Sequence, residues 1–181
     1  MRPLVVVVAM AVCGAACADT SVPPVAHDRS PADSADQFII GMQTVLNDAG
    51  LKRADILADT AYFFNDNARM EMRGVTANFF TSTGVNEGVL TAHRASYDTR
   101  TQIMEAWGNV VVTSMDGKRL TTSQLRFNNT SNLVHSDSAF RITEPDKTTE
   151  GIGFDSDPGL VNFKILHFLR GSAGTVSLPG K

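Results

Sequence analysis

The sequence predicts an all-β protein, a roll of repeated antiparallel hairpins that is either β-solenoid-like or an open jelly roll. Apolar and polar residues alternate with a period of two, as in residues 69–73, where Met70 and Met72 share one face. Polar clusters separate such segments, and Asp116-Gly117 is a strong hairpin signal. A comparable unit also recurs along the chain.

The recurring unit begins near an aromatic residue and continues through a short polar turn into a second strand. The four aromatic residues are Tyr62, Tyr97, Phe127 and Phe154. Successive units are about 30 residues apart, the size of one long hairpin. Hairpins repeated in this way stack into a roll.

One segment leaves the secondary structure open. Residues 42–59 contain apolar residues that also suit a short helix, although Gly50 interrupts it. The pattern therefore allows either a helix or strands there.

Composition limits the classes of function. The chain has 181 residues, of which 43% are hydrophobic and 19% charged, which suits one folded body. The net charge of −3 makes nucleic acid an unexpected partner. Only two cysteines occur, Cys13 and Cys17, so no disulfide framework is expected in the body. The four histidines lie on separate segments, and we expect no metal site and no cofactor.

The first residues have the layout of a secretory signal. Arg2 precedes an apolar stretch that ends in small residues before Cys17. We interpret residues 1–16 as a lipoprotein-type signal peptide and Cys17 as the lipidated residue. Ordinary secretion after Ala18 and an uncleaved anchor remain alternatives, although a membrane-spanning helix needs roughly 20 apolar residues.

Three further segments follow the signal. Residues 17–36 are rich in proline and small polar residues, as in a flexible linker. Residues 37–170 form the predicted roll, and the Gly/Ser-containing residues 171–181 are predicted to be a disordered tail.

Three phrases in the roll follow one another in a fixed order. Residues 90–97 have the form L-x-A-x-x-A-x-Y, residues 108–112 read G-N-V-x-V, and residues 116–122 contain D-G-x-x-L-x-T. This series resembles the repeat of the LptC/LptA (OstA-like) family, over residues 50–166 and most clearly over 87–143. A secretion signal with a single repeat block points to LptC-like proteins. These usually keep an N-terminal transmembrane helix, whereas this chain has a lipoprotein-type signal.

The resemblance implies a twisted open β-jelly-roll, in a periplasmic protein that binds lipopolysaccharide and is not an enzyme. It would accept this glycolipid from the inner-membrane ABC extractor, with its LptF/LptG-type subunits, and pass it to an LptA-type bridge protein. We expect the signal to direct the protein to the periplasm, where an N-terminal lipid would anchor it, and the inner membrane is favoured over the outer membrane. The alternative is a structural envelope lipoprotein whose roll is a protein-docking scaffold without lipid cargo.

Alternation along the strands, together with this resemblance, assigns candidate ligand-binding residues to an apolar inner face. They are Leu90, Ala92, Tyr97, Ile103, Trp107, Val110, Val112, Leu125, Phe127, Phe140 and Ile142. The alternative is that these residues form an ordinary packed core.

The last strand is predicted to span residues 161–168. Its apolar residues are candidates for a partner edge, at which a strand of the bridge protein would add. They are Val161, Phe163, Ile165 and Phe168. The alternative is that this edge folds back onto the body.

Overall fold

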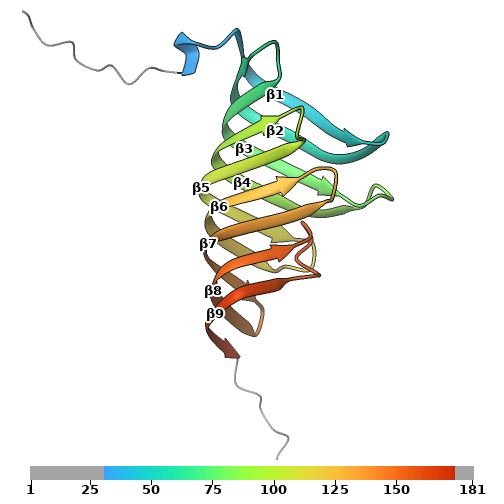
Figure 1. The fold of residues 1–181 in the computed structure, drawn as a ribbon. Coiled ribbons are helices and arrows are strands. Elements are labelled where there is room, and N and C mark those ends of the chain that lie inside the picture. The colour runs from blue at the N-terminus through green and yellow to red at the C-terminus, as the bar shows by residue number, and fades with distance from the viewer. Residues whose placement is uncertain (1–30, 174–181) are drawn as a thin grey trace, which may run out of the picture.

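The computed structural model describes residues 31–173, which form one open antiparallel sheet (Figure 1). The strands lie side by side in the order in which they occur in the sequence. They are β1 (Gln37–Asp48), β2 (Leu51–Phe64), β3 (Arg69–Phe80), β4 (Asn86–Asp98), β5 (Ile103–Ser114), β6 (Arg119–Asn128), β7 (Leu133–Glu144), β8 (Lys147–Ser156) and β9 (Lys164–Ala173). A short 3₁₀ helix, η1 (Pro31–Asp33), precedes them. The all-β, open jelly-roll prediction is confirmed.

Residues 42–59 belong to strands, not to a helix. β1 and β2 are joined by a tight turn at Ala49 and Gly50, with φ angles of 48° and 80°. Two consecutive positive φ values are those of the turn that matches strand twist in hairpins. The predicted repeat also corresponds to pairs of strands, because its aromatic residues lie near the ends of β2, β4, β6 and β8.

Most strands bend near their middle, where the alternation of buried residues slips by one position. In β3 the buried residues are Met70 and Met72 before the bend, and then Val75 and Ala77 after it. Gly74 lies at the slip with a φ of 61°, a conformation that favours glycine. Because an extra residue in a strand re-aims the side chains that follow, both halves of the strand direct apolar residues to the same side.

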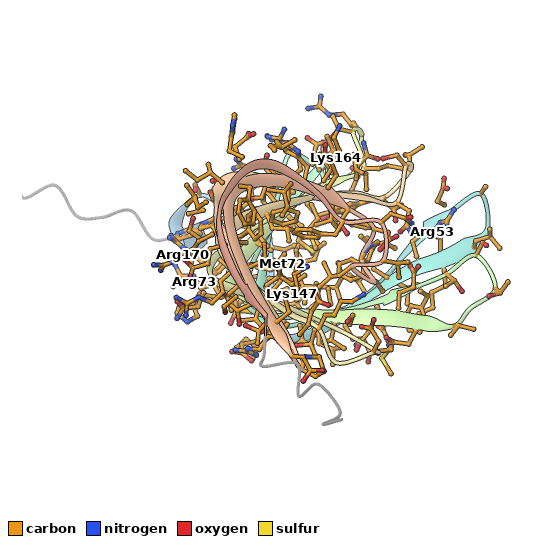
Figure 2. The ribbon with its side chains drawn as sticks, turned by 90° about the horizontal axis from the view of Figure 1, so that it is seen from below. Arg53, Met72, Arg73, Lys147, Lys164 and Arg170 are labelled. Atoms are coloured by element: carbon orange, nitrogen blue, oxygen red, sulfur yellow. The ribbon has the colours of Figure 1, made fainter. Side chains whose placement is uncertain are left out.

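The slips align across the sheet and form a line along which it folds. Pairing is interrupted at corresponding points of β4–β5, β5–β6, β6–β7 and β7–β8. Each bent strand thus has two arms that enclose a common interior, and Figure 2 shows the strands curving around the enclosed side chains.

The interior between the two arms is the hydrophobic core. Phe79 at the end of β3 and Phe127 at the end of β6 come from opposite arms, and their ring centroids lie 4.7 Å apart. Both side chains are completely buried. Full burial of such side chains stabilises the fold by roughly 1.5–3 kcal/mol each.

Turns from the two arms meet across the open side of the bend. The Asn129 side chain donates a hydrogen bond to the Asn47 carbonyl at 3.1 Å, and Lys118 donates one to the Leu160 carbonyl at 3.3 Å. These contacts, which we call the seam, bridge the arms without adding strands to the sheet.

The first strand begins where the predicted linker ends, and the last strand extends beyond its predicted end. β1 begins at Gln37, and η1 lies within the predicted linker. β9 continues to Ala173, so the prediction that residues 171–173 belong to a disordered tail is wrong; they pair with residues 147–149 of β8. The predicted signal peptide and Cys17 lie outside the described residues.

Candidate functional site

The interior opens at the β9 end of the sheet. A groove of about 540 Å³ lies there, between the last strands and the loop 157–163 that connects β8 to β9. Its apolar lining residues are Ile142, Leu160, Val161, Phe163, Ile165 and Phe168. Lys118, Glu144 and Lys147 also line it, so the groove is apolar with a charged rim.

The connecting loop is held in place by aromatic packing. The ring of Phe163 stacks on Phe154 with centroids 5.1 Å apart, and it meets the Phe140 ring edge-on at 5.3 Å. Phe154 and Phe140 belong to the buried core, so Phe163 ties the start of β9 to β7 and β8. Aromatic pairs in these geometries add roughly 0.5–1.5 kcal/mol beyond area burial.

A carboxylate fixes the polar atoms of the same loop. Asp157 accepts hydrogen bonds from the backbone N–H groups of Val161 at 2.8 Å and Asn162 at 3.1 Å. This satisfies backbone donors that would otherwise have no partner in the loop. The groove is therefore bordered by a fixed loop.

The Lys118 ammonium joins the rim to the seam. Its Nζ atom lies 2.8 Å from the Asp116 carboxylate and also contacts the Leu160 carbonyl. Asp116 accepts a short hydrogen bond from Ser114 as well. The hydrogen bonds from Lys118 and Ser114 lower the pKa of Asp116 to about 2. The hydrogen bond to Asp116 raises the pKa of Lys118, so the lysine is charged at neutral pH.

β9 is an edge of the sheet beside this groove. It pairs with β8 on one side, and no other described strand pairs with its second side. Leu166, Phe168 and Leu169 are exposed on it. An exposed strand edge with apolar side chains is a template for another strand. The edge therefore does not fold back onto the body within residues 31–173.

Most of the predicted inner-face residues do face the interior. Those that are buried there are Leu90, Ala92, Tyr97, Val110, Val112, Leu125, Phe127, Phe140 and Ile142. Several are fully buried by their neighbours, so the middle of the interior is packed. Ile142 is the member of this set that lines the groove at the β9 end.

The inner-face prediction is wrong for Ile103 and Trp107. Met104 and Ala106 lie on the same side of the bend in β5, and both are completely buried. Ile103 and Trp107 occupy the intervening positions and point outward. Their size and apolar character favoured them as core residues, but in a strand the parity of the position decides the face.

All four predicted partner-edge residues line the groove. Ile165 and Phe168 lie in β9. Val161 and Phe163 belong to the preceding loop, so their prediction as strand residues is wrong. Phe163 packs on core aromatics, and this inward contact leaves it unable to extend the strand.

Leu160, Lys118 and Lys147 line the groove without having been predicted. Leu160 has a φ of 55° and is almost completely buried. The Pro158-Gly159 pair predicts a turn at this point, but not the direction of the following side chain. Lys118 and Lys147 follow hairpin turns, and only the folding of the sheet brings those turns to the groove.

The described residues contain no group of three or more His, Cys, Asp or Glu side chains arranged to hold a metal ion. Within residues 31–173, no helix has the length and apolar character needed to cross a membrane. His135 does have carboxylate neighbours: its Nδ1 lies 2.7 Å from Asp155, and its Nε2 lies 3.2 Å from Asp137.

Comparison with known proteins agrees with this architecture. The family model described as "Lipopolysaccharide-assembly, LptC-related" matches residues 3–172, nearly the whole chain. No individual curated protein matches the sequence significantly. The chain therefore belongs to the LptC family, periplasmic envelope proteins that act in lipopolysaccharide transport.

Proposed function

We propose that this protein binds lipopolysaccharide at the β9 end of its roll and relays it from the inner-membrane ABC extractor to an LptA-type bridge protein. One observation carries the proposal: the apolar groove and the free edge of β9 lie at the same end of the sheet. Residues Ile165 and Phe168 belong to both. Cargo leaving the groove would therefore meet a strand added at the edge.

The apolar lining suits acyl chains. Each CH₂ group removed from water contributes roughly 0.8 kcal/mol, so an acyl chain gains much from entering such a groove. The packed middle of the interior indicates that chains first occupy the open end, where Ile142, Phe163 and Phe168 lie.

The rim suits the phosphorylated sugars of a glycolipid. Lys147 lies at the start of β8, and no ion pair engages it within residues 31–173. An ammonium group can bind a phosphate as a point charge. Glu144 shares the rim, so the geometry favours a phosphate on the Lys147 side of the groove.

The opposite edge supports contact with the extractor. β1 pairs only with β2 among the described strands. The proposed relay thus uses β1 toward LptF/LptG-type subunits and β9 toward the bridge protein, and strand addition would align the rolls.

In-cell photo-crosslinking tests the cargo. A photoreactive residue replaces Phe168 or Ile142 in the groove, and Arg141 on the outward face of β7 serves as the control. We expect lipopolysaccharide adducts at Phe168 and Ile142 that require active extractor, and none at Arg141. A folded protein without adducts at either groove position would contradict the proposal and favour a docking scaffold.

The anchor is tested separately. We propose that Cys17 carries lipid that holds the protein at the inner membrane. Lipoproteins are anchored stably by more than one acyl chain. Cys17→Ala should release the protein into the soluble periplasmic fraction, and unchanged membrane retention would contradict the lipid anchor without affecting the cargo proposal.

A further inference from the structure

Two arginines face each other on the outer side of the sheet. Arg73 of β3 and Arg94 of β4 are direct cross-strand partners, and both are exposed. Figure 2 shows Arg73 on the outside of the bend and Met72, its predecessor, inside. Like charges directly opposite in a sheet are destabilising. The repulsion means that this pairing does not by itself stabilise the sheet.

No carboxylate neutralises this pair among the described residues. The neighbouring acids are engaged elsewhere: Glu71 pairs with Arg69 at 3.3 Å, and Glu105 pairs with Arg126 at 2.6 Å. Asp59 lies across from Gly74, and no ion pair joins it to either arginine. The positive charge on this face is therefore available to an anion.

Each arginine instead lies over an aromatic ring. The guanidinium of Arg73 is 5.8 Å from the Tyr62 ring centroid, and that of Arg94 is 5.9 Å from the Trp107 ring. Tyr and Trp side chains are enriched at membrane–water interfaces, where an apolar ring body and a polar tip are both accommodated.

Apolar side chains continue the same surface toward the start of β1. Ile40 of β1 pairs with Thr60 of β2, which in turn pairs with Arg73, so the three side chains lie on the same face of the sheet. Phe38 pairs directly with Tyr62. Phe38 is 58% exposed and Ile40 is 76% exposed. Phe38 is the second residue of β1, so this surface lies where the preceding N-terminal segment enters the roll.

We infer that this outer surface, formed by Phe38, Ile40, Tyr62, Arg73, Arg94 and Trp107, docks the roll onto a membrane of anionic phospholipids. The arginines would pair with headgroup phosphates, for which guanidinium geometry is well suited. The aromatic and aliphatic side chains would enter the interface beneath them. This surface is separate from the groove at β9, and the inference is independent of the cargo.

Trp107 provides a direct readout, since it is the single tryptophan of the chain. The full chain carrying Cys17→Ala is mixed with phosphatidylcholine vesicles containing phosphatidylglycerol with brominated acyl chains. We expect a blue shift and quenching of Trp107 emission, which phosphatidylcholine alone does not produce. Tethering through the N-terminal segment alone would leave this emission unchanged.

The test compares two double variants with the same N-terminal segment. Arg73→Gln/Arg94→Gln should weaken vesicle binding about 30-fold, as expected for two basic residues near an anionic surface. Its urea midpoint should stay close to that of the parent, because relief of the repulsion and loss of the two ring contacts act in opposite directions. Arg141→Gln/Arg170→Gln, also on the outward face, should bind like the parent chain.

Three outcomes would overturn the inference. One is unchanged Trp107 emission on anionic vesicles. Another is equal quenching by anionic and neutral vesicles, and the third is equal binding by both double variants. A response of Trp107 to an acidic protein, without one to vesicles, would instead assign this surface to a protein partner.

Discussion

The Asn129 side chain, on the turn after β6, donates a hydrogen bond to the carbonyl of Asn47 near the end of β1, 82 residues earlier in the sequence. The two residues lie on different arms of the folded sheet, and Asn129 is completely buried. Side-chain contacts between turns thus hold the seam, where no strand pairs with another. The strength of these contacts determines how firmly the interior is closed.

Replacing Asn129 tests the seam directly. Asn129→Ala removes the bond to Asn47 and a second, 3.4 Å contact to Gln102. We expect the free energy of unfolding to fall by about 0.5–1.5 kcal/mol, because the part-buried hydrogen bond between the two arms is lost. Urea denaturation measures the change. Asn78→Ala, on the outward face of β3, should alter stability by less than about 0.5 kcal/mol.

A glycine on the seam has no room for a side chain. A Cβ atom at Gly88 would lie 2.8 Å from the Pro158 carbonyl and 3.0 Å from the Thr113 carbonyl. Since both contacts are with backbone, Gly88→Ala should cost about 1–3 kcal/mol and push the loop 157–163 outward. Thermal and urea unfolding measure the cost. A Cβ atom at Gly159 would lie no closer than 3.6 Å to its neighbours, so Gly159→Ala is the control. An equal loss of stability in Gly159→Ala would contradict a steric limit at Gly88.

Phe163 both packs on the core and lines the groove, so we expect it to affect stability and cargo binding. Phe163→Ala removes the stack on Phe154 and should lower the free energy of unfolding by about 2 kcal/mol, less than for a fully buried ring. Lipopolysaccharide crosslinking from Ile142 should fall as well. Phe168→Ala, whose side chain is 63% exposed, should keep stability and affect crosslinking only. An equal loss of stability in both variants would contradict the assignment of Phe168 to cargo binding alone.

The strand edge can be tested with proline. Consecutive residues of a strand direct their N–H groups to opposite sides, and proline removes that donor. Proline is placed at two successive positions, in Leu166→Pro and in His167→Pro. The variant that loses an N–H group directed at β8 should have weaker strand pairing. The variant that loses an N–H group on the free side should fold normally but bind the bridge protein less well. Circular dichroism and pull-down distinguish the two. Full partner binding by a folded variant in both cases would exclude strand addition at β9.

His135 predicts a pH dependence of stability. Hydrogen bonding to Asp155, and secondarily to Asp137, raises the pKa of His135 in the folded protein. The stability that the charged His135 contributes is therefore fully present below the pKa of histidine in the unfolded chain, about 6.5. It is lost as the pH rises through the higher pKa of His135 in the folded protein. The stability difference between the parent and His135→Gln should therefore shrink between pH 6 and pH 8.5. A difference that grows with pH would contradict the ion pair.

Much of the fold was predictable because alternation and turn residues are local signals. The hairpin at Asp116-Gly117 and the repeat that begins near Tyr97, Phe127 and Phe154 depend on neighbours in the sequence. The aligned slips at the middle of the strands were not predicted. A slip of one residue reverses the face of every following side chain, and a single sequence shows it only weakly.

Part of the candidate site was also predictable from the sequence, and part was not. Local pattern identified Ile165 and Phe168 as apolar edge residues and most of the buried interior. It misplaced Trp107, whose face follows from strand parity rather than from its size. Local patterns in the sequence were sufficient to predict a chain of antiparallel hairpins with an apolar interior. The folding of the sheet into two arms, the packed middle and open β9 end of the interior, and the pairing of Arg73 with Arg94 follow from strand register and from contacts between distant turns, which local patterns do not contain.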